Sequence, residues 1–238
     1  MATVSTQHAD DRGAGDRDAA DSPRDRLLAA AIRMLEDGGP EALQARKLAA
    51  EIGASTMAVY THFGGMRQLM AAIAEEGFAR LNGRMAQVPE TGDPIADLIR
   101  LGVAYRDHAT ANPQLYRVMF GVVTAGGYKL ATGDMNELMS SSQDSEGRTA
   151  FEYLVRSVAR VIEAGSGPGE DAVQAASQVW SATHGYVLLE IAGYFGEEGY
   201  GQQNVLLPLA TKLITGLGHS PEAVQRSVQQ VAARGSAA

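Results

Sequence analysis

Apolar residues recur every three or four positions along most of this chain, which is the spacing of one helix face, and no segment alternates as a strand does. Residues that interrupt helices, mainly glycine and proline, separate the periodic segments. We expect helices at residues 66–81, 94–111, 113–123, 130–139, 151–164, 170–195, 204–217 and 221–233, with a loop at 140–145. The pattern predicts an all-α fold.

An earlier helix is expected to begin after Ser22. Ser22 is a good N-cap, Pro23 occupies the first turn, where its missing N–H costs nothing, and Asp25 lies three residues after the cap. The glycines and proline at residues 38–40 end this helix. Its buried face consists of apolar residues at helical spacing: Leu27, Leu28, Ala31, Ile32 and Leu35.

Residues 44–67 predict two short helices that meet at a tight turn. Leu48 and Ile52 share one face of the first helix, and Gly53 can adopt the left-handed conformation that ends it. Ser55 is the expected N-cap of the second helix. Val59 and Phe63, four residues apart, would then pack against the first helix.

If Val59 and Phe63 point inward, the other face of the second helix is free to enter a DNA major groove. Spacing alone leaves an ordinary helical hairpin equally open. The residues expected to face DNA are those on the outward face and the nearby cations: Arg46, Lys47, Ser55, Thr56, Met57, Tyr60, His62 and Arg67.

The segment from Arg26 to Leu69 resembles the DNA-binding domain of the tetracycline-repressor (TetR) family, most specifically in Tyr60-Thr61-His62-Phe63 after the Gly53 turn. The resemblance implies a helix-turn-helix domain of three helices. Two positions depart from the family pattern. Gln44 replaces the usual Ser or Thr N-cap, and Met66 replaces a lysine that contacts phosphate, so both phosphate contacts are in doubt.

Net charge is −8, which at first argues against a nucleic-acid partner. The distribution changes this, because residues 22–82 carry seven acidic and seven basic residues and the excess acid lies elsewhere. We therefore expect double-stranded DNA to be bound by two copies acting together. Cysteine is absent, which fits a reducing cytoplasm, and no apolar segment approaches about 18 residues, so we expect neither a membrane span nor a secretion signal.

Nothing in the sequence predicts catalysis. The five histidines are scattered, and no nucleophile elbow, phosphate loop or dinucleotide-binding motif is present. We therefore expect no enzyme activity, no metal site and no cofactor.

The second part of the chain carries Trp180-Ser181-Ala182-Thr183-His184-Gly185, which together with residues 112–121 resembles a TetR subgroup named for a Trp-x-x-x-His-Gly motif in its effector domain. Trp180 and His184 share a helix face. Packing of the domain is one interpretation and ligand contact the other. Pattern and resemblance select seven residues for an apolar ligand site: Tyr105, Tyr116, Met119, Phe120, Phe151, Trp180 and His184.

We expect a disordered tail at 1–21, a DNA-binding domain at 22–82 and a helical effector-binding and dimerisation domain at 83–238, the two joined by the long helix 66–81. The resemblance implies a homodimeric repressor, paired through residues 170–195 and 204–217, that a small molecule releases from a palindromic operator. Two alternatives remain: a helix-turn-helix regulator without a small-molecule effector, and a helical protein that does not bind DNA.

Overall fold

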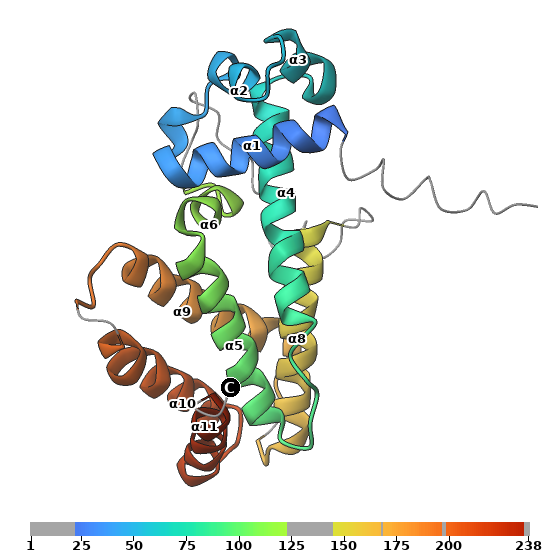
Figure 1. Ribbon diagram of the computed structural model, residues 1–238. Coiled ribbons are helices and arrows are strands. Elements are labelled where there is room, and N and C mark those ends of the chain that lie inside the picture. Colours follow the sequence, from blue (N-terminus) through green and yellow to red (C-terminus); the bar gives the residue numbers. More distant parts are fainter. Residues whose placement is uncertain (1–21, 123–144, 168, 197–198, 236–238) are drawn as a thin grey trace, which may run out of the picture. The chain divides into compact units, whose positions relative to one another are not determined.

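The computed structural model describes residues 22–122, 145–167, 169–196 and 199–235, and every regular element in these ranges is a helix (Figure 1). The all-α prediction is therefore confirmed. The predicted tail at 1–21 and the helix and loop at 130–145 lie outside the described residues, apart from Ser145. The described residues form two compact units that divide after Ile73, within the continuous helix α4, Met66–Met85. None of the described helices is long and apolar enough to cross a membrane.

In the first unit, α1 spans Pro23–Gly38 and begins as the sequence predicts. The Ser22 side chain accepts a hydrogen bond from the Asp25 backbone N–H at 3.2 Å, which satisfies a donor that the helix itself leaves unpaired. The helix buries Leu27, Ile32 and Leu35. A single 3₁₀ turn, Pro40–Ala42, leads into the next helix.

The two short helices of the predicted turn are α2, Ala45–Glu51, and α3, Met57–Phe63, and α1 contacts both. Gly53 has a φ of 66°, the left-handed conformation expected there. The side chains of Leu48 and Val59 are fully buried. The guanidinium of Arg24 lies 4.9 Å from the centre of the Phe63 ring, which fixes the end of α3 against α1.

The predicted Ser55 cap is wrong. The N-cap position of α3 is occupied by Thr56, neither helix of the pair has a side-chain cap, and Ser55 contributes only its backbone carbonyl, which accepts from Ala58. Gln44 stands at the N-cap position of α2 but does not cap it, because its side-chain amide donates to the Glu41 carbonyl instead. These short helices therefore depend on packing more than on capping.

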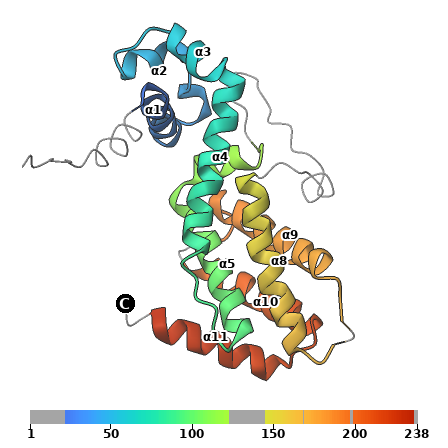
Figure 2. The same cartoon turned by 90° about the vertical axis from the view of Figure 1, so that its right-hand side faces the viewer.

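The second unit contains the rest of α4 and six further α-helices among the described residues (Figure 2). Its core is formed where α5 contacts α8 and α11 and where α8 contacts α9. Their bounds are α5 Pro94–Ala111, α6 Pro113–Met119, α8 Glu146–Ala164, α9 Ala172–Ile191, α10 Leu207–Gly216 and α11 Pro221–Gly235, with a π-helical segment, Gln202–Leu206, preceding α10.

Several ends differ from the prediction because capping, and not the apolar pattern, sets them. Helix α8 begins five residues before the predicted start at Phe151, since Ser145 caps it by accepting from the Arg148 N–H. The amide of Asn82 on α4 donates to the carbonyl of Glu146 at 2.9 Å and holds this end. Helix α9 ends at Ile191, four residues before the predicted end, and Gly193 follows with a φ of 82°.

A buried carboxylate organises the far end of this unit. Asp97 on α5 is 3% exposed and accepts hydrogen bonds from the backbone and hydroxyl of Thr91, from Arg100 and from Arg160 of α8. Arg160 also donates to the Thr91 carbonyl. Asp97 thereby joins α5, α8 and the segment after α4. Burial by itself would raise the pKa of Asp97, but the bonds from Thr91 and Arg160 outweigh it and lower the pKa.

Replacing Asp97 with alanine should lower the free energy of unfolding by about 3 kcal/mol, because two arginines lose their buried partner. The lowered folded-state pKa means that Asp97 stabilises the fold above its unfolded pKa of about 4 and that this contribution is lost as the pH falls through the folded value. The variant should therefore lose stability less steeply than the parent below about pH 4. Urea unfolding at several pH values, followed by fluorescence of Trp180, the one tryptophan, measures the free energy of unfolding and its pH dependence.

Asp107→Ala is the matched control, since this carboxylate is on the same helix but 49% exposed, and we expect a change within about 0.5 kcal/mol. Equal stability of Asp97→Ala and the parent would contradict the role given to Asp97.

Candidate functional site

Helix α3 presents its outer face to solvent in the first unit. Met57 is 66% exposed and Tyr60 is 51% exposed, although both are large and apolar. Thr56 and Thr61 are also exposed, whereas His62 is only half-buried. The expected outward face is thus present, with His62 at its margin.

Three cations flank this face. Arg46 and Lys47 are exposed on α2, and Arg67 is exposed in the first turn of α4. Gly64, with a φ of 77°, makes the sharp turn between α3 and α4. We refer to Arg46, Lys47, Ser55, Thr56, Met57, Tyr60, His62 and Arg67 as the α3 surface.

The second candidate site is an aromatic cluster in the second unit, assembled from α5, α6, α8 and α9. Most of the seven predicted residues meet there: Phe120 lies 4.5 Å from His184 and 6.0 Å from Trp180 between ring centres. Phe151 lies 6.2 Å from Trp180 and closes one side. Residues distant in sequence are thus brought together as expected.

Met119 has a different environment from the other six. It is 3% exposed, and a Cβ added at Gly77 of α4 would lie 2.7 Å from its Cγ. Gly77 therefore allows the Met119 side chain to pack directly against the α4 backbone. Met119 serves as a packing residue between α6 and α4 here.

The polar atoms of the cluster bond to one another. The Trp180 indole N–H can only donate, and it donates to the Tyr105 hydroxyl at 3.2 Å. The Tyr105 and Tyr116 oxygens are 2.7 Å apart, and the Tyr116 oxygen lies 2.6 Å from Nδ1 of His184. We call this series the tyrosine–histidine chain.

One direction of donation satisfies the whole chain: Trp180 to Tyr105, Tyr105 to Tyr116, and Tyr116 to His184 Nδ1. The reverse direction would leave the Tyr105 hydroxyl hydrogen without an acceptor among the described residues. His184 is therefore the Nε2–H tautomer. Burial lowers the pKa of His184 and raises the pKa of both tyrosines, so all three groups are neutral.

Two further residues of the second unit were not among the predicted site residues. Phe78 of α4 packs edge-on against Phe120 at 5.3 Å, and the apolar spacing of α4 placed it on a helix face without indicating which partner it meets. His108 on α5 is 1% exposed, and neither ring nitrogen has a hydrogen-bond partner among the described residues. Burial lowers the pKa of His108 to about 4, with smaller contributions from Arg84 and Arg80.

No described group of three or more His, Cys, Asp or Glu side chains is placed to hold a metal ion. What the described residues do present is an exposed helix-turn-helix face in one unit and an aromatic cluster, partly or fully buried, in the other. These two features define a helix-turn-helix regulator with a helical second domain.

Comparison with known proteins identifies the family. The family model described as "Bacterial regulatory proteins, tetR family" matches residues 27–73, and the model described as "Tetracyclin repressor-like, C-terminal domain" matches residues 98–206. Together they span well over half of the chain, which therefore belongs to the TetR family of transcriptional regulators. Neither description mentions a Trp-x-x-x-His-Gly motif, so membership of that subgroup stays a prediction.

Individual relatives agree in fold. An uncharacterised HTH-type transcriptional regulator of Mycobacterium tuberculosis is 27% identical over 174 residues, 71% of each chain. A solved protein of unknown function from Rhodococcus sp. RHA1 is 26% identical, covers 83% of this chain and 96% of its own, and has a TM-score of 0.65. A TetR variant from Acinetobacter baumannii in complex with minocycline is 24% identical, covers 80% and 93%, and has a TM-score of 0.54.

Imidazole ¹⁵N shifts at neutral pH should show a protonated Nε2 and an unprotonated Nδ1 at His184, and the ring should take up a second proton only below the ordinary range of histidine because burial lowers its pKa. Tyr116→Phe should keep this tautomer, since Tyr105 lies 3.1 Å from Nδ1 and can donate in its place. The substitution should cost about 1 kcal/mol of stability. A proton on Nδ1 in the parent would contradict the direction of donation that we assign to the tyrosine–histidine chain.

Proposed function

We propose that this protein is a homodimeric repressor that binds a palindromic operator through the α3 surface and is released by a small, mainly apolar ligand in the second unit. The observation that carries the proposal is the outer face of α3, which exposes large side chains although the opposite face of the helix is buried in the core of the helix-turn-helix domain. Large apolar side chains such as Met57 and Tyr60 are costly to leave in water unless a partner covers them. A major groove, with its thymine methyl groups, is such a partner.

The cations of the α3 surface supply the remaining contacts. Arg46, Lys47 and Arg67 can bond phosphates, which fixes the position of α3 without reading sequence. Gln44 and Met66 supply no charge where the family pattern has its phosphate contacts. Three cations, two on α2 and one in the first turn of α4, give modest affinity, so two copies must bind together.

The surface for pairing two copies is provided by α9 and α10. Helix α10 and the π-helical segment before it carry Val205, Leu206, Leu207, Leu209 and Leu213, yet Ile214 is the one buried residue among them in the single chain. Leu189 of α9 is 46% exposed. We infer a homodimer through α9 and α10, the helices within the predicted ranges 170–195 and 204–217, as a four-helix bundle about a two-fold axis.

The ligand would bind at the aromatic cluster. Five of its members are aromatic rings or imidazole from α5, α6 and α9, and such walls bury a large apolar area. The polar groups there already satisfy one another, so a ligand must offer them a hydrogen bond at least as good. For release, the ligand must prefer a conformation in which the two α3 helices no longer fit the operator. We expect this to take place in the cytoplasm, where the operator is.

The closed tyrosine–histidine chain also supports a second function, a TetR-family regulator that uses no small molecule. In that case the cluster is a packing element and the protein binds DNA constitutively or under control of a protein partner. The two functions differ in one measurement, the effect of small molecules on operator binding.

Tyr60→Ala should weaken binding to the operator by about 1–3 kcal/mol, because α3 loses an exposed contact at the groove. Gel shifts against the DNA upstream of the protein's own gene, at several salt concentrations, measure it. Tyr60→Phe keeps the ring and should fall between the parent and Tyr60→Ala if the hydroxyl bonds DNA. Operator binding by Tyr60→Ala that equals the parent's would refute the proposed surface.

His184→Phe should weaken the response to a releasing ligand about tenfold while operator binding stays as in the parent. Phenylalanine keeps a ring beside Phe120 but removes the acceptor at the end of the chain. The ligand is first found by a thermal-shift screen and then assayed for release of labelled operator. A full response in this variant would place the ligand elsewhere, and a screen without hits that alter operator binding favours the second function.

A further inference from the structure

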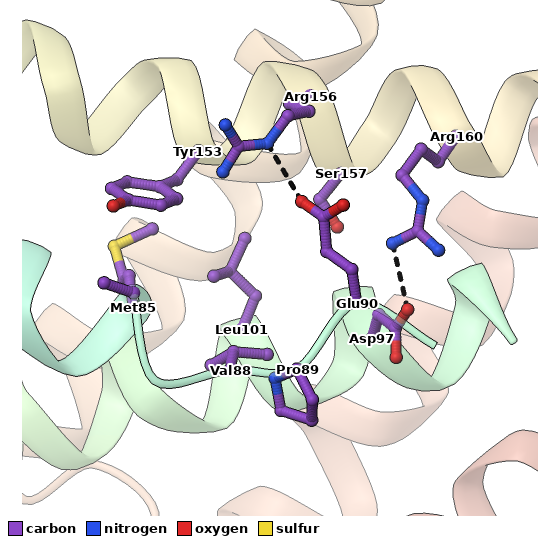
Figure 3. Close-up of a pocket in the computed structure, with 11 residues that line it drawn as sticks. Met85, Val88, Pro89, Glu90, Asp97, Leu101, Tyr153, Arg156, Ser157 and Arg160 are labelled. Carbon is purple, nitrogen blue, oxygen red and sulfur yellow. Dashed lines mark hydrogen bonds and ion pairs between the residues drawn. The ribbon is translucent and has the colours of Figure 1, made fainter. Parts of the chain in front are cut away.

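A separate pocket of about 260 Å³ lies at the end of the second unit that is organised by Asp97 (Figure 3). Three segments form it: the end of α4 with the residues that follow, helix α5, and one face of α8. None of its lining residues belongs to the aromatic cluster. We propose that it binds a small carboxylate with an apolar body.

One wall of the pocket is apolar. Met85 and Leu101 are buried beside it, and Val88 and Pro89 border it from the segment after α4. Figure 3 shows these side chains gathered on the side opposite α8. An apolar body of a few methylene groups would gain affinity with each one that it buries there.

The opposite wall consists of polar side chains on one face of α8. Tyr153, Arg156, Ser157 and Arg160 recur at three- and four-residue spacing and therefore share that face. Both terminal nitrogens of Arg160 already donate, one to Asp97 and one to the Thr91 carbonyl. The other three have hydrogen-bonding capacity that no described residue uses: the hydroxyls of Tyr153 and Ser157 and both terminal nitrogens of Arg156.

Arg156 selects the charge of the ligand. Its Nε lies 3.1 Å from Glu90, but both side chains are more than half exposed, so this ion pair is weak and easily exchanged. The Tyr153 ring, 5.0 Å from the guanidinium carbon, holds the guanidinium in place. The two unused terminal nitrogens form the fork that binds a carboxylate in bidentate fashion.

Glu90 is then a competitor for the site, since it offers the same guanidinium a carboxylate of the protein itself. The ion pair between the buried Asp97 and the partly buried Arg160 keeps the pocket in shape, because it fixes Thr91, the neighbour of Glu90, to α5 and α8. The pocket thus combines an apolar wall, a few convergent polar groups and a replaceable internal anion.

The test is titration of the full chain with sodium octanoate and, separately, with octanol, which has the same apolar body without the charge. Isothermal calorimetry at constant ionic strength gives both affinities. We expect octanoate to bind about tenfold more tightly than octanol. Arg156→Gln should weaken octanoate binding about tenfold and remove this preference.

Glu90→Gln should have the opposite effect and tighten octanoate binding about threefold or more, because the competing carboxylate is gone. Both residues are largely exposed, so both variants should fold as the parent does, which circular dichroism verifies. The matched control is Arg148→Gln, which removes an arginine that pairs with Glu152 on the same helix and should leave octanoate binding unchanged.

Octanoate binding that is equal in the parent and Arg156→Gln overturns the proposal, as does equal binding of octanoate and octanol. Octanoate binding that is lost in His184→Phe and retained in Arg156→Gln places the ligand in the aromatic cluster. That last result refutes this site while leaving the proposed function intact, and the gel shifts that test the proposed function do not depend on octanoate.

Discussion

The tyrosine–histidine chain imposes the strictest constraint on the second unit, because the buried hydroxyls of Tyr105 and Tyr116 and the partly buried imidazole of His184, from α5, α6 and α9, must satisfy one another. An unpaired hydroxyl or imidazole in such a place costs about 1–3 kcal/mol. The 2.7 Å and 2.6 Å distances leave little freedom for the helices that carry Tyr105, Tyr116 and His184. The aromatic rings around the chain, including Trp180 and Phe120, exclude water and make the constraint stronger. The same hydrogen-bonded side chains that fix the packing of these helices are therefore the groups that a ligand in the cluster would meet.

The sequence predicts most of this fold because local signals are strong. Helix periodicity gave every described α-helix, and the left-handed turn at Gly53 and the cap at Ser22 followed from residue type. It predicted the ends less well. Ser55 has the right chemistry for a cap, but the turn places Thr56 at the cap position, and no local pattern reveals that shift. Likewise the early start of α8 follows from the Ser145 cap together with a hydrogen bond from Asn82, which lies 64 residues from Glu146 in the chain.

For the sites, residue type predicted which side chains lie near one another, but it did not predict the individual contacts that they make. The aromatic residues of the effector part do converge, yet Met119 packs on Gly77, and the direction of the hydrogen bonds follows only from distances. The sequence did not predict the roles of Asp97 and Arg156. A charged residue within an amphipathic helix reads as solvent-exposed, and only the packing of α5 on α8 shows that Asp97 is buried while Arg156 borders a pocket.

Helix α4 gives the two candidate ligand sites a common element. The aromatic cluster contacts its middle through Phe78, and the proposed carboxylate pocket contacts its last residue, Met85. A packed helix transmits a displacement along its length because its backbone hydrogen bonds resist bending. Helix α4 continues into the first unit. A ligand in either site that binds more tightly to one position of α4 would therefore shift the equilibrium between positions of this one helix. Two ligands that prefer the same position would then bind cooperatively, and two that prefer different positions would oppose each other.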